Sequence, residues 1–167
     1  MLILGIDPGT AIVGYGLVQV TSGRPQAIDY GCIRTKAKDK ASLRLVTIYD
    51  KIKDLIKKHQ PDTIAVEELF FNKNTRTALS VGQARGVILL AAAHSGLPIA
   101  EYTPLEVKQA VTGFGRAPKD QIQRMVKVLL NLETIPKPDD VADALAIGLC
   151  HASFASWKEK EQEAKNW

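Results

Sequence analysis

The chain has 167 residues, of which 46% are hydrophobic and 24% charged, so we expect one globular domain and exclude a disordered chain. A net charge of +4 and a pI of about 9.1 permit nucleic-acid binding without proving it. Two isolated cysteines, no apolar run of bilayer length and no signal-peptide features favour a cytoplasmic protein.

The first predicted element is a strand that begins at Leu2 and runs to a carboxylate, Asp7, before a Pro-Gly breaker. Its continuous apolar run is typical of a strand that is buried on both faces. An aspartate at the carboxyl end of such a strand lies where open α/β sheets place their ligands. Asp7 therefore either contributes its carboxylate to an acidic metal site or only starts an Asx turn.

The rest of the chain reads as two more strands followed by alternating helices and strands. Strands are predicted over 12–20 and 27–35, and their link has hairpin length, which indicates an antiparallel meander with the first strand. Hydrophobic spacing and breakers then predict, in order, a helix over 40–59, a strand over 63–66, a helix over 76–95, a strand over 98–102, and helices over 104–112, 119–130 and 140–154.

This order predicts an α/β fold with a mixed five-stranded sheet and helices on its faces. We expect residues 1–156 to form one domain. Residues 157–167 are rich in charge and are expected to be a flexible C-terminal tail.

Carboxylates recur where predicted elements end or begin. Glu67 and Glu68 follow the strand at 63–66, while Asp140 and Asp143 share one face of the last helix's first turn. Acids at the start of a helix are also ordinary caps, although one cap does not need the three aspartates at positions 139, 140 and 143. Carboxylates brought together repel, and hard cations such as Mg²⁺ or Mn²⁺ relieve that repulsion. Two such ions could assist hydrolysis of a phosphodiester. Alternation along a strand leaves Glu67 and Glu68 equally possible.

Basic residues flank the acidic segments, and each alone is more simply a surface charge than a DNA contact. They are Lys73, Arg76, Arg85, Lys108, Arg116 and Lys119. Contacts from such residues to phosphates would orient duplex arms and make affinity fall with salt. Phe70 and Phe71 follow the acidic strand end. They are either core residues or, for at least one ring, a platform that stacks on an unpaired base.

Seven segments, in order and at family spacing from residue 5 to about 150, resemble the bacterial RuvC family of crossover junction endodeoxyribonucleases, the Holliday junction resolvases. The segments are Gly5-Ile6-Asp7-Pro8-Gly9-Thr10, Gly14-Tyr15-Gly16, Gly31-Cys32-Ile33-Arg34-Thr35, Val66-Glu67-Glu68-Leu69-Phe70, Gly82-Gln83-Ala84-Arg85-Gly86, Val107-Lys108-Gln109 and Ala142-Asp143-Ala144-Leu145-Ala146. Any one of them is weak evidence, and together they are specific.

The resemblance implies an RNase H-like fold, a homodimer, and symmetric nicking of two strands of a four-way DNA junction in recombination and repair. It implies Mg²⁺ as cofactor, with Mn²⁺ as a substitute and two ions per active site once DNA is bound. By position, the catalytic and metal-binding acids are Asp7, Glu67, Asp140 and Asp143. The family's junction-migration proteins, RuvA and RuvB, are the implied partners.

The resemblance also assigns the expected DNA contacts. Lys108 and Lys119 match phosphate-binding lysines, and Phe70 matches an aromatic residue that stacks on bases near the junction centre. Lys73, Arg76 and Arg116 complete the DNA-binding residues that we expect. The helix that begins near Arg76 matches the dimer helix, which suits its many small residues.

Three other functions remain to be weighed. A phosphotransferase of the actin-like group also opens with an Asp-x-Gly-Thr turn, but it needs a second, related domain for which 167 residues leave no room. A catalytically inert junction-binding subunit would lack a carboxylate, and none is missing here. A related RNase H-like nuclease acting on other nucleic acids would be distinguished by the substrates it cleaves.

Overall fold

The computed structural model of the chain describes residues 1–68 and 75–165, apart from the side chains of residues 75, 76 and 156–165. Its strands are β1 (Leu2–Asp7), β2 (Ile12–Thr21), β3 (Arg24–Arg34), β4 (Thr63–Glu67) and β5 (Ile99–Tyr102). Its helices are α1 (Ala41–His59), α2 (Thr75–His94), α3 (Pro104–Thr112), α4 (Lys119–Leu129) and α5 (Asp139–Lys165). Each predicted element is present, and apart from the end of α5 the ends coincide with the prediction or differ by one to three residues.

The strands form one mixed five-stranded sheet, as the sequence predicted, and their order in it is β3-β2-β1-β4-β5. β1, β2 and β3 are antiparallel, whereas β4 lies parallel to β1 and β5 parallel to β4. The β2–β3 pairing continues to Thr21 and Arg24, so the hairpin turn is shorter than expected. Ser22 and Gly23 both have positive φ, 51° and 75°, which matches the twist of a two-residue hairpin turn.

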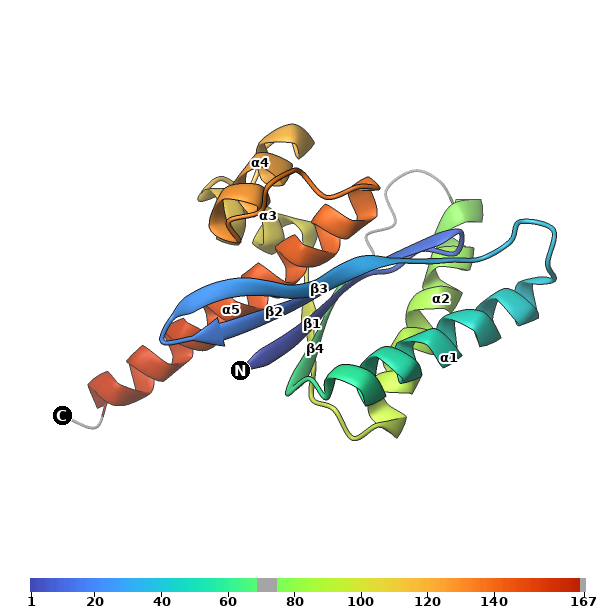
Figure 1. The fold of residues 1–167 in the computed structure, drawn as a ribbon, viewed down its shortest axis with the longest axis horizontal. Helices are drawn as coiled ribbons and strands as arrows, with labels where there is room; N and C mark the ends of the chain where they lie inside the picture. The colour runs from blue at the N-terminus through green and yellow to red at the C-terminus, as the bar shows by residue number, and fades with distance from the viewer. Residues whose placement is uncertain (69–74, 166–167) are drawn as a thin grey trace.

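Helices cover both faces of the sheet, with α1 and α2 on one side and α3, α4 and α5 on the other (Figure 1). Ile48, Ile52 and Ile56 lie four residues apart and form the buried stripe of α1. Ile3 and Leu4 are neighbours in β1, yet Ile3 packs in the core under α5 and Leu4 in the core under α1. This alternation is the pleat of a strand that is buried on both faces.

Helix α5 lies unusually close to the sheet. A Cβ built on Gly5 in β1 would lie 2.2 Å from the carbonyl oxygen of Ala144, closer than real side chains approach. Glycine is therefore required where the helix backbone crosses the strand. This close crossing places the start of α5 beside the ends of the central strands.

The last helix continues to Lys165, well beyond the end predicted at residue 154. Residues 158–165 contain no glycine or proline and are mostly Lys, Glu, Gln and Ala, which favour helix. The flexibility of residues 157–167 stays a prediction. In the described part of the chain, we find no helix with the length and apolarity to cross a bilayer.

Candidate active site at the ends of β1, β4 and α5

The first two acids are side by side because β1 and β4 are adjacent parallel strands. Ile6 pairs with Val66, so Asp7 and Glu67 occupy the next position at the carboxyl ends of both strands. Ala65 packs in the core beneath α5, and alternation places Glu67 on that same face. Asp7 shares the face, since Ile3 also packs there. This geometry favours Glu67 over Glu68, the choice that alternation alone left open.

The other two acids arrive on α5. Gly14 in β2 pairs with Asp7 across the antiparallel ladder. A Cβ on Gly14 would lie 1.9 Å from the carbonyl oxygen of Asp140, so the first turn of α5 rests directly on this glycine. Helix α5 begins at Asp139, which puts Asp140 and Asp143 in its first two turns above Asp7.

The pKa values of the acids record how closely they meet. Burial raises the pKa of Asp7 to about 8, and the negative charges of Glu67, Asp143 and Asp140 add to the rise. Burial and then Asp143 raise the pKa of Glu67 to about 7. Burial also raises the pKa of Asp143, against the effect of its hydrogen bond with Lys119. The structure therefore brings together all four acids predicted from the sequence.

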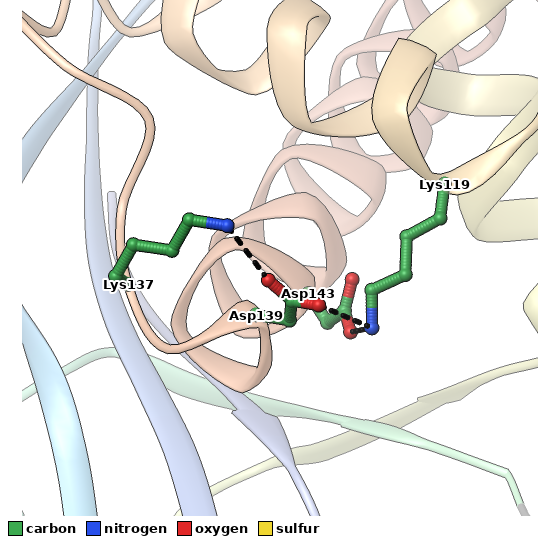
Figure 2. Close-up of polar contacts among 4 residues, drawn as sticks. All are labelled: Lys119, Lys137, Asp139 and Asp143. Atoms are coloured by element: carbon green, nitrogen blue, oxygen red, sulfur yellow. Dashed lines mark hydrogen bonds and ion pairs between the residues drawn. The ribbon is translucent and has the colours of Figure 1, made fainter.

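An ammonium group lies among these carboxylates (Figure 2). Lys119, the first residue of α4, places Nζ 3.0 Å from Asp143 Oδ2 and 3.6 Å from Asp139 Oδ2. Lys137 binds the other oxygen of Asp139 at 3.1 Å. Burial lowers the pKa of Lys119, but the hydrogen bond and charge of Asp143 outweigh that effect and leave the pKa raised. Lys119 is thus held as a cation beside the acids.

A hollow of about 190 Å³ opens beside the acids, with Glu67, Asp143, Lys108 and Lys119 in its lining. Lys108 comes from α3, whose start is fixed by a capping box in which Thr103 and Glu106 bind each other's backbone N–H. Carboxylates and lysines in one hollow suit a ligand that combines phosphate with a cation. A larger apolar hollow of about 670 Å³ near Leu105 lies between α3 and α5 and does not include these acids.

The chemistry of the donors fits a hard divalent cation. All four acids offer carboxylate oxygens, the ligands that Mg²⁺ and Mn²⁺ prefer. The pKa values of Asp7 and Glu67 are raised first by burial and then by repulsion between the acids, and a bound cation would offset both effects. Within the described residues, no three His, Cys, Asp or Glu side chains are already arranged around a common metal position. Lys119 instead supplies the positive charge at Asp143.

The expected DNA contacts divide into three groups. Lys108 and Lys119 line the hollow, and Arg116 is exposed on the segment between α3 and α4. Phe70 and Lys73 fall outside the described residues, as does the side chain of Arg76 in α2.

Three neighbours of the site were not anticipated as such. Lys137 and Asp139 join the charge cluster through the ion pairs above. Their signal in the sequence was their position next to Asp140, which is also where ordinary helix caps occur. Arg85, weighed as a DNA contact, turns inward: its Nε donates to the carbonyl oxygen of Glu67 at 3.1 Å, and its guanidinium pairs with Glu101. No local spacing pattern links Arg85 to either partner.

Comparison with known proteins gives consistent matches. The family model "Crossover junction endodeoxyribonuclease RuvC" matches residues 3–151. A protein of that name from Moorella thermoacetica is 70% identical over 163 residues, covering 98% of each chain. A Thermus thermophilus RuvC structure superposes with a TM-score of 0.88 at 35% identity, covering 95% of this chain and 97% of that one. The T. thermophilus RuvC complex with a Holliday junction substrate also gives 0.88, at 36% identity and coverage of 93% and 94%.

Proposed function

We propose a catalytic role for the four acids from the premise that the chain belongs to the RuvC family of crossover junction endodeoxyribonucleases. Membership makes the chain a hydrolytic nuclease of Holliday junction resolution in DNA recombination and repair, built on the family's RNase H-like fold. The observation that carries the proposal is the convergence of Asp7, Glu67, Asp140 and Asp143 from three separate elements. The pKa values of Asp7, Glu67 and Asp143 are raised there, and the charge of Asp140 acts on Asp7 and Asp143.

The four carboxylates would hold two divalent cations, Mg²⁺ or Mn²⁺, when junction DNA is bound. The cations supply a lowered pKa for the attacking water and charge stabilisation at the leaving oxygen. Asp7 would hold a cation together with its neighbours, since the charges of Glu67, Asp143 and Asp140 all act on it. Because the pKa values of Asp7 and Glu67 are raised, both acids would have to be deprotonated in order to hold a cation.

The lysines in the lining bind the phosphate. Lys108 and Lys119 face the hollow, where their charges already act on Glu67. With DNA in the site, the ammonium of Lys119 would bind a phosphate oxygen in place of Asp143, and that carboxylate would then be available to hold a cation. Arg116 contacts the backbone of a duplex arm from its exposed position. Phe70, Lys73 and Arg76 keep the DNA-binding roles that the resemblance implies.

Symmetric nicking requires two active sites, and α2 offers a surface for a second copy. Leu79 is 68% exposed and Leu90 is 48% exposed, with exposed Gly86 between them. Residues at this spacing share one helical face, and an apolar face with a small residue at its centre suits close packing against the same helix of a partner. The homodimer, the cytoplasmic location and docking to RuvA and RuvB complete the proposal.

Glu67→Gln and Glu68→Gln form a matched pair that tests the site. Both changes remove one negative charge at the end of β4, but Glu67 alone belongs to the acidic face. With Mg²⁺ and a synthetic four-way junction, Glu67→Gln should abolish nicking while junction binding persists, and Glu68→Gln should cleave at close to the parental rate. Duplex and RNA–DNA hybrid substrates of equal length should remain uncut. Equal activity of the two variants would contradict the assignment.

A further inference from the structure

The peptide group between Glu67 and Glu68 is held from both sides. Its N–H, which belongs to Glu68, donates to the carbonyl oxygen of Tyr102 at 2.8 Å. Its carbonyl oxygen, which belongs to Glu67, accepts from Nε of Arg85 at 3.1 Å. The first bond is the end of the β4–β5 ladder, whereas the second comes from a helix. A side chain therefore fixes the orientation of the peptide at which the strand ends.

Arg85 reaches this peptide from the face opposite the acids. It lies on α2, which covers the same face as α1 (Figure 1). Alternation from Ala65 places the Glu67 carboxylate on the face of α5. The side chain of Arg85 is 20% exposed and pairs with the carboxylate of Glu101 in β5. Glu101 lies opposite Val66 in the parallel ladder. Arg85 thus joins α2 to the ends of both β4 and β5.

We propose that Arg85 is a positioning residue for DNA cleavage: it holds the Glu67 peptide so that the Glu67 carboxylate faces Asp7, and Glu101 keeps the guanidinium in place. Arginine suits this role because its planar fork donates in two fixed directions at once. A lysine could satisfy one partner at a time. The proposal rests on the catalytic role of Glu67 and adds a residue that neither contacts DNA nor binds a cation.

The test compares Arg85→Ala, Arg85→Lys, Glu101→Gln and the double variant Arg85→Ala/Glu101→Gln. Arg124→Ala is the control, because it removes an equal charge from an exposed ion pair with Asp120 on α4. Junction affinity and its salt dependence are measured without divalent cations. Cleavage is measured under single-turnover conditions with Mg²⁺. Dimer mass and thermal unfolding are measured on the same samples.

Arg85→Ala should lower the cleavage rate about ten- to a hundredfold, because displacement of a reacting group by about 1 Å has effects of that size. Junction affinity, its salt slope and the dimer mass should stay unchanged. Arg85→Lys should recover part of the rate, and Glu101→Gln should lower it severalfold. The double variant should be no slower than Arg85→Ala, since both residues act through one peptide. Arg124→Ala should cleave like the parent.

Three results would overturn the proposal. Weaker junction binding with a smaller salt slope and an unchanged rate would make Arg85 a phosphate contact. A lower dimer mass would assign it to assembly. A rate that falls only in proportion to the unfolded fraction would leave it a purely structural role. Glu67→Gln, run alongside, separates these failures from failure of the proposed function, which would show as cleavage by that variant.

Discussion

Replacing Gly14 with alanine should slow cleavage far more than it weakens junction binding. The added Cβ would lie 1.9 Å from the Asp140 carbonyl oxygen, whereas real Cβ contacts essentially never fall below 3.0 Å. The first turn of α5 must therefore retreat by about 1 Å, since packed backbone does not compress. Asp140 and Asp143 move with it, away from Asp7. A misplacement of that size costs about a hundredfold in rate, and overpacking costs about 1–3 kcal/mol of stability.

Single-turnover nicking of a four-way junction with Mg²⁺ measures the rate, and urea unfolding measures the stability. Gly148→Ala is the matched control, because it also crowds the contact between α5 and the sheet. Its Cβ would meet Cγ2 of Val18 at 2.8 Å, two turns along the helix from Asp140. The control should lose stability at most and keep its rate once folded. Parental cleavage by folded Gly14→Ala would show that the acids do not depend on this contact.

Three further outcomes follow from the charges of the site. Asp7→Asn should abolish nicking and keep junction binding. At pH 8 without metal it should also raise the free energy of unfolding by more than about 1.4 kcal/mol, the equivalent of one pKa unit. Chemical denaturation that shows a lower free energy of unfolding would contradict this. In the parental chain the pKa of Asp7 rises from 3.8 to about 8 on folding. The folded chain therefore binds more protons than the unfolded chain between these values, so stability without metal should fall as pH rises from about 4 to 8. Saturating Mg²⁺ should make this decline in stability smaller. A stability that does not change with pH would contradict the raised pKa of Asp7. Lys119→Ala should reduce the salt slope of junction binding by about one and increase Mg²⁺ affinity in calorimetry, because Asp143 loses its ammonium partner; an unchanged slope would remove Lys119 as a phosphate contact.

The sequence predicted the sheet well, and it placed the candidate acids at the ends of elements, because these signals are local. Apolar runs that stop at Asp7 and Glu67 mark strand ends, and the spacing of Asp140 and Asp143 marks one helical face. The residues alone did not distinguish Glu67 from Glu68, and the choice of Glu67 came from the resemblance to the RuvC family. Its physical basis is the packing of Ala65 under α5, which depends on a helix 80 residues later in the chain.

Long-range partners were beyond local reasoning. Arg85 contacts Glu67 and Glu101 only because α2 returns across the ends of β4 and β5, so its charge alone could not distinguish it from a DNA contact. Lys119, expected to contact a phosphate, pairs with Asp143. In both cases the side-chain type suggested a charged partner, while the identity of that partner depended on tertiary structure.

In strand β4, the face of the sheet on which an acid lies depends on whether it occupies an odd or an even position. The strand, Thr63–Glu67, pairs with β1 on one side and with β5 on the other. A shift by one position would move an acid from the face of Asp7 to the opposite face. A single-residue deletion within the strand would exchange Glu67 for Glu68 and bury the wrong side chains. Insertions and deletions should therefore be tolerated in the β2–β3 turn, whereas within β4 they should abolish cleavage.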